Sequence, residues 1–473
     1  MNAPRVTTSR PGGESAALCP SGNTFRINPL RISHRHSLTT FDAAAPPAIQ
    51  TRQIAGLSGR TVCFTRASAW TTRRGPMHGI RQAVRALAIR RTGRKSFTRS
   101  GRPASNFPPL LIPAQGCNPF LQQGTAAMSD TAYTTEALVI HAKEDLRLDR
   151  VAITAPGTGE VTVRVAWGGI CGSDMHYVKH GGVGASVLRE PMILGHEISG
   201  FVERTGPGVS GLVQGAPVAI HPARPCGDCP ECRRGLRHLC GDTRFLGSAA
   251  MLPHTDGGFR RLMTVAASQV YPLPPGLDVR SACLAEPLSV ALHAIARAGE
   301  VRGRTILVQG AGPIGALIVA GLKIAGAETI VATDLQDFPL SIARRMGATS
   351  VINTAATPYR ADHDIVFEAS GAASALPTAI ACTAKGGILV QVGMFPPGDV
   401  GIPLGQIIAR ELDYRGSFRF DAEFGTALDL LATNPWIAEG LVTHRFGLSA
   451  FDEAFTTSID RRHASKVLFD MAG

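Results

Sequence analysis

The sequence contains no apolar run long enough to cross a membrane. Its most apolar stretch, residues 316–325, is interrupted by Lys323, and a membrane-spanning helix needs roughly 18 apolar residues. We therefore expect no membrane partner. The 52 glycines and the 44% of hydrophobic residues are typical of a globular α/β chain and exclude a collagen-like or coiled-coil protein.

Acidic residues are almost missing from the first 127 positions. Glu14 and Asp42 stand there against 18 Lys and Arg, a local net charge of +16, whereas residues 128–473 carry 30 basic and 34 acidic side chains, a net charge of −4. The first segment therefore carries the whole basic excess of a chain whose formal charge is +12. It also holds 12 of the 32 prolines and no hydrophobic periodicity, so we expect a disordered basic extension.

Three explanations of this extension stay open. An Arg-rich segment that is poor in acids is typical of an organelle-targeting peptide. A nucleic-acid-binding tail would also be basic, but aromatic residues are sparse and no binding motif occurs, so we expect no nucleic-acid partner. The third explanation is that translation starts at Met128, since periodic sequence begins within ten residues of it. We favour this start, which predicts a slightly acidic cytoplasmic protein.

The rest of the chain changes character at about residue 285. Short strand-like segments bounded by Gly and Pro, such as residues 137–140 and 161–165, indicate a compact β-rich domain before that point. Strands then alternate with helices, which is typical of a doubly wound parallel sheet in an α/β protein. The clearest expected strands are residues 305–308, 329–332, 364–367 and 387–392, and the clearest helices are residues 313–325 and 340–346.

Four cysteines fall within fifteen residues, at Cys226, Cys229, Cys232 and Cys240. Closely spaced thiolates in one loop can surround Zn²⁺ as a tetrahedron, and four thiolates leave no open position, so such a site is structural. Two disulfides are the alternative. We favour zinc because we expect the organised region to be cytosolic, where thiols stay reduced.

A second set of metal-binding residue types surrounds Cys171. Ser173 follows it by two positions, and His196 and Glu197 lie 25 and 26 residues after Cys171. One Cys, one His and one carboxylate can bind Zn²⁺ and leave a position for water or substrate, which is the arrangement of a catalytic site.

A glycine-rich turn predicts a dinucleotide site. It follows an expected strand, opens an expected helix and has the sequence Gly310-Ala311-Gly312-Pro313-Ile314-Gly315. Asp334 ends the next strand, 19 residues after Gly315, where an acid binds the adenosine ribose hydroxyls. Residues 335–340 contain no Arg that could pair with a 2′-phosphate. The sequence therefore favours NAD over NADP.

The stretch Gly195-His196-Glu197-Ile198-Ser199-Gly200, followed by Gly206 and Val209, resembles the signature of the zinc-containing medium-chain alcohol dehydrogenases, and so does the four-cysteine loop. The resemblance extends from about residue 136 to 473. Residues 244–249, 253–259 and 416–420 are most similar to the polyol branch, which includes sorbitol and L-threonine dehydrogenases, and within it to the L-idonate 5-dehydrogenases.

The resemblance implies an architecture. A GroES-like catalytic domain would comprise residues 128–288 and 418–473, and a Rossmann domain residues 289–417. Because relatives form dimers or tetramers, we expect a homo-oligomer.

The resemblance also implies a role for each matching residue. Cys171, His196 and Glu197 would hold a catalytic zinc, and the four cysteines a structural zinc. Glu286 would ligate the catalytic zinc directly or relay a proton through water, with His196 also in the catalytic set. The other implied site residues are Ser173 as a proton shuttle, Tyr177 and Arg419 as polyol contacts, and Val392, Gly393 and Met394 near the nicotinamide.

The expected activity is oxidation of a secondary alcohol in a small polyol or sugar acid, with hydride transfer to NAD and L-idonate as the expected substrate, giving 5-keto-D-gluconate. Arg419 and Arg244 are candidate cations for the substrate carboxylate. Sorbitol, xylitol and L-threonine are alternative substrates. A nucleotide-binding sensor without catalysis is the alternative of another class.

Overall fold

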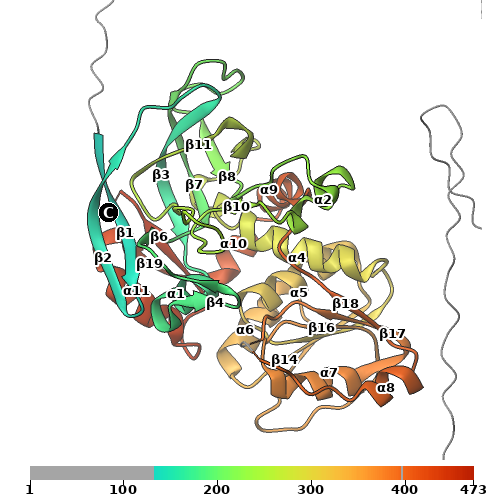
Figure 1. Ribbon diagram of the computed structural model, residues 1–473. Coiled ribbons are helices and arrows are strands. Elements are labelled where there is room, and N and C mark those ends of the chain that lie inside the picture. Colours follow the sequence, from blue (N-terminus) through green and yellow to red (C-terminus); the bar gives the residue numbers. More distant parts are fainter. Residues whose placement is uncertain (1–132, 396–397, 473) are drawn as a thin grey trace, which may run out of the picture. The chain divides into compact units, whose positions relative to one another are not determined.

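The computed structural model describes residues 133–395 and 398–472. The expected basic extension of residues 1–127 and the alternative start at Met128 lie outside the described residues. The described chain contains a β-rich part and a part built on a parallel sheet (Figure 1).

The β-rich part is organised around a seven-stranded sheet. Its strand order is β12 (Val270–Pro272), β8 (Pro217–Ile220), β7 (Glu197–Thr205), β3 (Glu160–Gly169), β20 (Lys466–Asp470) and β19 (Val442–Gly447), with β11 (Leu262–Ala266) beside β3. In β3, the alternate residues Val161, Val163 and Val165 are buried, as expected of a strand with one face on the core. The rings of Phe259 and Phe469 meet edge to face in this core, 5.1 Å apart.

Shorter elements complete the β-rich part. They are the sheet β2 (Asp145–Ile153), β1 (Tyr133–Ala142) and β6 (Met192–Ile193), the pair β4 (Gly182–Val183) and β5 (Ser186–Val187), the pair β9 (Ala223–Arg224) and β10 (Arg244–Phe245), and the helices α1 (Gly172–His180), α2 (Pro230–Arg233), α3 (Val279–Ala282) and α11 (Phe451–Ile459). The expected strands 137–140 and 161–165 are confirmed, since they lie inside β1 and β3.

The last described strand, β20, belongs to the same seven-stranded sheet as β3, near the start of the described chain. β20 runs antiparallel to β3, with Leu468 opposite Gly169, and parallel to β19. The chain therefore leaves the β-rich part along α4 (Ala285–Ala298) and returns to it after the parallel sheet. Two helices, α9 (Glu423–Thr433) and α10 (Trp436–Leu441), lie on the way back, and α9 packs on α4, where Nδ1 of His293 is 2.8 Å from Oε1 of Glu423.

The second part is a Rossmann fold. Its six parallel strands have the order β15 (Ser350–Asn353), β14 (Thr329–Asp334), β13 (Thr305–Gln309), β16 (His363–Glu368), β17 (Thr383–Gln391) and β18 (Asp413–Gly416). This is the order 3-2-1-4-5-6 of dinucleotide-binding folds, in which the sheet reverses direction between the first and fourth strands. The expected parallel sheet is confirmed.

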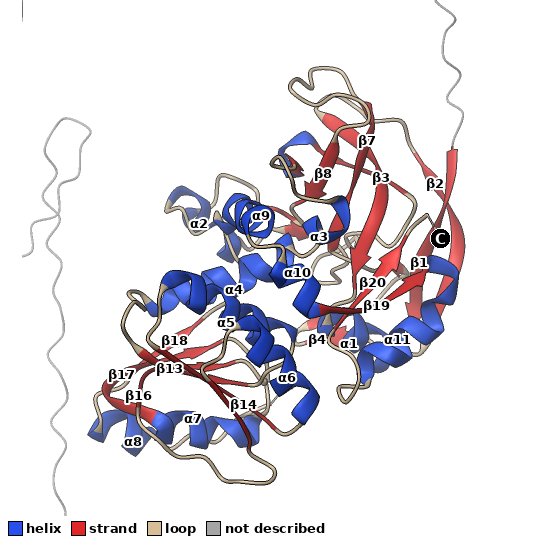
Figure 2. Cartoon of the chain, turned by 180° about the vertical axis from the view of Figure 1, so that it is seen from behind, coloured by secondary structure: helices blue, strands red, loops and turns tan. Residues whose placement is uncertain are grey.

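Helices cover both faces of this sheet (Figure 2). The helices α4, α5 (Pro313–Ala325) and α6 (Asp337–Met346) pack on one face, and α7 (Leu376–Cys382) and α8 (Leu404–Ala409) lie along the other. In β13, Ile306 and Val308 face the first layer and Leu307 the second. The unbroken apolar run of this strand therefore reflects burial on both faces.

The expected helix 313–325 has the bounds of α5, but the helix expected at 340–346 begins three residues earlier, at Asp337. Pro339 lies in the first turn of α6, where a backbone N–H has no partner within the helix, so proline is tolerated there.

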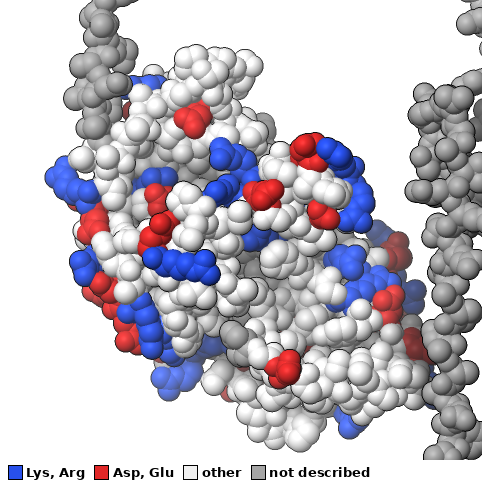
Figure 3. Space-filling view, in the orientation of Figure 1, with Lys and Arg blue, Asp and Glu red and all other residues white. Residues whose placement is uncertain are grey.

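No helix among residues 133–395 and 398–472 is long and apolar enough to span a membrane. On the face shown in Figure 3, basic and acidic side chains are interspersed over the described part.

Candidate active site

The four-cysteine loop lies between β9 and β10. The turns α2 and η1 (Arg237–Leu239) fold this loop so that its four sulfur atoms lie within 4.8 Å of one another. Sγ of Cys226 is 3.5 Å from Sγ of Cys240 and 4.0 Å from Sγ of Cys232, whereas a disulfide bond measures about 2.05 Å. Sulfur atoms around tetrahedral zinc, with Zn–S bonds of about 2.3 Å, are about 3.8 Å apart. The loop therefore fits a zinc ion.

Cys171 lies at the N-terminal end of α1, where Asp174 holds the backbone in place. The backbone N–H of Cys171 donates to Oδ2 of Asp174 at 2.9 Å, and that of Gly195 donates to Oδ1 at 3.2 Å. Asp174 is fully buried, so it joins the first turn of α1 to the segment that carries His196. Burial raises the pKa of Asp174, with partial opposition from His196. Nothing in the sequence distinguished this Asp from an ordinary helix-capping residue.

His196 and Glu197 are brought to Cys171 by a turn that requires glycine. Gly195 has φ +96°, and a Cβ there would lie 2.3 Å from the Phe259 ring. As a result, the ligand atoms of Cys171, His196 and Glu197 all lie within 4.8 Å of one another. A thiol, an imidazole and a carboxylate at this spacing fit a metal ion with an open position.

Burial lowers the pKa of the His196 imidazole, but the nearby Asp174 and Cys171 outweigh it and raise the pKa well above the usual value. Nδ1 of His196 lies 3.7 Å from the Asp174 carboxylate. The ring therefore faces an anion on one side and the thiol on the other, an environment that also suits a cation bound between the three candidate ligands.

Lys466 is a buried cation at this site that the sequence analysis missed. Its Nζ donates to both oxygens of Glu197, at 2.7 and 3.0 Å, and to the carbonyl of Ile170 at 3.1 Å. Burial lowers the pKa of Lys466, but the charges of Glu197 and Cys171 outweigh it and raise the pKa. Lys466 thus stays charged and fixes the Glu197 carboxylate. A lysine at the start of a strand gave no signal, because such residues are mostly exposed.

Glu286 lies in the first turn of α4 and is 6% exposed. Burial raises its pKa to about 7, with a further contribution from Glu197 and opposition from His196. A carboxyl group with this pKa exchanges its proton near neutral pH. The position suits proton transfer beside the three candidate metal ligands.

The proposed proton shuttle and substrate contacts occupy different surroundings. Ser173 is half-buried in the first turn of α1, two residues after Cys171. Tyr177 is only 3% exposed, and its hydroxyl accepts the N–H of Ala249 at 2.9 Å. Tyr177 is therefore packed in the core of the β-rich part, with its own O–H left to donate.

Arg419 lies close to the candidate metal ligands. Its guanidinium stacks on the Phe245 ring at 4.6 Å, and that ring is 5.6 Å from the His196 ring. Arg419 has φ +53°, an uncommon conformation for a residue other than glycine. Burial lowers its pKa, opposed by Tyr177 and Glu286. Such backbone geometry is frequent at ligand-binding positions.

Arg244, the other candidate cation, binds the loop that follows β10. Its guanidinium donates to the carbonyls of Pro253, at 2.6 Å, and Leu252, at 3.4 Å. It lines a cavity of about 420 Å³ together with Arg224 and Arg260. The structure thus separates the two arginines that the sequence grouped together.

The glycine-rich turn follows β13 at the point where the strand order reverses. Gly310 has φ +95°, and a Cβ there would lie 2.6 Å from the backbone of Ser370. A Cβ on Gly315 would lie 1.8 Å from the carbonyl oxygen of Gly310. Gly312 directly precedes α5, whose first residues are Pro313 and Ile314. Free N–H groups at this helix end fit the phosphates of a dinucleotide.

Asp334 ends β14 beside this turn. Its Oδ2 accepts the N–H of Ala311 at 2.9 Å, and its Oδ1 accepts the N–H groups of Leu335 and Gln336 at 2.7 and 3.1 Å. Residues 335–340 supply no Arg, and the inference from them that a 2′-phosphate would find no arginine beside Asp334 is wrong: Nη2 of Arg461 is 3.2 Å from its Oδ2. Arg461 comes from the loop after α11, far along the chain from residues 335–340.

The segment expected near the nicotinamide follows β17. The N–H groups of Val392 and Gly393 donate to the Glu368 carbonyl, at 2.8 and 2.9 Å. Met394 is 58% exposed, and its Cε lies 3.5 Å from the position of a Cβ on Gly184. The segment therefore lies at the boundary between the Rossmann sheet and the β4 turn.

Two family models match the chain. The alcohol dehydrogenase GroES-like domain matches residues 157–275, and the zinc-binding dehydrogenase model matches residues 313–433.

Individual relatives cover the same region. An L-idonate 5-dehydrogenase (NAD(P)(+)) of Escherichia coli is 38% identical over 341 residues, covering 70% of this chain and 98% of that protein. A sorbitol dehydrogenase of Gallus gallus is 38% identical over 333 residues, covering 68% of this chain and 92% of that protein. The crystal structure of the Escherichia coli L-idonate 5-dehydrogenase superposes with a TM-score of 0.68 at 36% identity and covers 72% of this chain and 99% of its own. The chain therefore belongs to the family of zinc-dependent polyol dehydrogenases, oxidoreductases that bind NAD(P) and act on small molecules.

Proposed function

We propose that this protein oxidises L-idonate to 5-keto-D-gluconate with NAD as the hydride acceptor. The observation that carries the proposal is the position of Arg419, a cation separated from His196 by the single ring of Phe245. A sugar acid needs such a cation for its carboxylate, whereas sorbitol does not. The similarity to a relative named L-idonate 5-dehydrogenase supports the same substrate.

The proposal includes two zinc ions per chain. Cys171, His196 and Glu197 would hold the catalytic ion, and the four-cysteine loop the structural ion. The catalytic unit would comprise residues 128–288 and 418–473, and the nucleotide unit residues 289–417. Cytoplasmic location and a homo-oligomeric state remain predictions.

Zinc bound at the first set would supply Lewis acidity toward the substrate hydroxyl, and the nicotinamide would accept the hydride. Ser173, two residues after Cys171 and half-buried, would pass the hydroxyl proton outward. Glu286 would exchange a proton near neutral pH. Lys466 would keep the Glu197 carboxylate oriented toward the cluster.

Asp334 supports NAD as the preferred cofactor. Its carboxylate lies beside the glycine-rich turn, where the hydroxyls of an unphosphorylated ribose can donate to it. Val392, Gly393 and Met394 would line the nicotinamide end of the same site.

The experiment is a comparison of initial rates with NAD on L-idonate, sorbitol, xylitol and L-threonine. We expect kcat/KM to be highest with L-idonate. A higher kcat/KM with sorbitol or xylitol would contradict L-idonate as the substrate and indicate a polyol instead. No turnover on any of the four substrates by zinc-loaded protein would contradict the enzymatic function and favour a non-catalytic nucleotide sensor.

Arg419→Met tests how the carboxylate is recognised. We expect KM for L-idonate to rise about 10- to 100-fold, since a hydrogen bond to a charged group contributes roughly 1.5–3 kcal/mol, while KM for sorbitol changes less than about threefold. Arg244→Met is the matched control and should leave both constants near wild type, because Arg244 binds backbone carbonyls of its own loop. An equal rise for both substrates in Arg419→Met would contradict carboxylate binding.

A further inference from the structure

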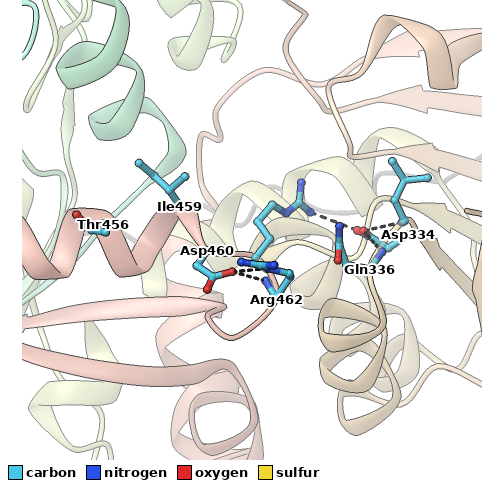
Figure 4. A pocket seen from close by; sticks show the side chains of 8 residues that line it. Asp334, Gln336, Thr456, Ile459, Asp460 and Arg462 are labelled. Atoms are coloured by element: carbon cyan, nitrogen blue, oxygen red, sulfur yellow. Dashed lines mark hydrogen bonds and ion pairs between the residues drawn. The ribbon is translucent and has the colours of Figure 1, made fainter. Parts of the chain in front are cut away.

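A cavity of about 530 Å³ lies next to Asp334, and its walls come from two distant segments of the chain (Figure 4). One wall follows β14 and the other is the end of α11 with the loop after it. The lining residues are Asp334, Leu335, Gln336, Thr456, Ile459, Asp460, Arg461 and Arg462. The cavity thus joins the ribose-binding end of the Rossmann sheet to a loop of the β-rich part.

Arg461 reaches from that loop to the nucleotide-binding residues. Besides its contact with Asp334, its Nη2 lies 3.3 Å from the position that a Cβ on Gly312 would occupy. The guanidinium therefore lies between the carboxylate that would bind the adenosine ribose and the turn that would bind the pyrophosphate. No arginine of residues 335–340 provides a cation at this place.

Asp334 does not depend on Arg461 for its position. Three backbone N–H groups, those of Ala311, Leu335 and Gln336, already hold the carboxylate. The Arg461 side chain is 52% exposed and makes one hydrogen bond to Asp334. It can turn from the carboxylate to another anion in the same cavity without breaking the packing of either sheet.

The other charged groups of the cavity are satisfied within their own loop. Asp460 accepts the Nε–H of Arg462, and its second oxygen lies 2.8 Å from Nδ1 of His463. Asp337, three residues after Asp334, accepts from the Asn353 side chain at 2.7 Å. Arg461 is thus the cation of this cavity that faces Asp334.

Building on the proposed function, we propose that Arg461 is a cofactor-specificity residue that binds the 2′-phosphate of NADP, so that the site accepts both dinucleotides. With NAD, the ribose hydroxyls donate to Asp334. With NADP, the Arg461 guanidinium leaves Asp334 and pairs with the phosphate, for which its planar array of donors is suited. An arginine near the ribose is the general means of accepting a 2′-phosphate; here it comes from the β-rich part.

The test is equilibrium binding of NADH and NADPH to the zinc-loaded full chain without any alcohol, measured by calorimetry or nicotinamide fluorescence. We expect wild type to bind NADPH within about tenfold of its affinity for NADH. Arg461→Gln should weaken NADPH binding about 10- to 100-fold and change NADH binding less than about threefold. Arg462→Gln is the matched control and should change neither affinity by more than about threefold, since Arg462 pairs with Asp460.

Competition with nucleotide fragments tests the contribution of the 2′-phosphate alone. The affinity for adenosine 2′-phosphate should be lower in Arg461→Gln than in wild type, whereas the affinity for adenosine 5′-phosphate should be unchanged. Wild type that binds NADH but not NADPH would overturn the proposal. An equal loss of affinity for NADH and NADPH in Arg461→Gln would also overturn it, because the guanidinium would then bind the pyrophosphate that both dinucleotides share.

These measurements do not use turnover. If L-idonate is not the substrate, the ratio of the two affinities still decides the role of Arg461. If neither dinucleotide binds to wild type, the proposed function and this inference both fail.

Discussion

Cys171→Ala is expected to lower kcat by about three orders of magnitude or more with any alcohol substrate while leaving the fold intact. Loss of the thiolate removes one of three candidate ligands, and Lewis-acid stabilisation contributes several kcal/mol, about tenfold in rate per 1.4 kcal/mol. The local fold should survive because Asp174 binds the backbone N–H of Cys171 and not its side chain.

The measurements are kcat, the melting temperature and zinc content by mass spectrometry. We expect zinc to fall from about two ions to about one per chain, with melting nearly unchanged. Cys382→Ala is the control, because Cys382 is a buried thiol of α7, outside both cysteine sites. Full zinc content together with more than about a tenth of wild-type activity in Cys171→Ala would show that this thiol is not a ligand.

Lys466→Met is expected to lower the free energy of unfolding of the zinc-free protein by about 3–5 kcal/mol, the usual effect of removing one partner of a buried ion pair. The Glu197 carboxylate would stay buried, and its space is limited because a Cβ on Gly169 would lie 2.0 Å from its Oε2. In zinc-loaded protein the loss should be smaller, since bound Zn²⁺ compensates part of the carboxylate charge.

Urea unfolding with and without zinc measures both effects. The double variant Lys466→Met/Glu197→Gln should recover most of the loss in zinc-free protein, because no charge is then left buried without a partner. A loss below about 1 kcal/mol in the zinc-free single variant would mean that water or a neighbouring group replaces Lys466.

Sequence patterns predicted those parts of the site whose residues are close together in the chain. The four cysteines lie in one loop, and the glycine-rich turn lies between a strand and a helix that periodicity alone identifies, so their geometry follows from short-range spacing. The bounds of α5 were predicted for the same reason: Pro313 opens the helix and Gly326, in a left-handed conformation, follows its last residue.

Residues that join distant segments could not be predicted in this way. Lys466 and Arg461 reach Glu197 and Asp334 only because β20 inserts between β3 and β19, and no pattern in the sequence encodes that pairing. Asp174 could not be identified from the sequence, because its carboxylate binds the backbone of two segments that are distant in the chain. Arg244 and Arg419 were equivalent as cations in the sequence. In the structure Arg419 stacks on the Phe245 ring, whereas Arg244 binds carbonyls of its own loop.

The late position of β20 has a consequence for biosynthesis. Glu197 and Lys466 are 269 residues apart, and at about 5–20 residues per second a ribosome needs roughly 15–50 s to make the chain between them. The strands of the Rossmann sheet are all synthesised within that interval, so this sheet can form on the ribosome first. The seven-stranded sheet of the β-rich part stays incomplete, and Glu197 stays without Lys466, until β20 leaves the ribosome.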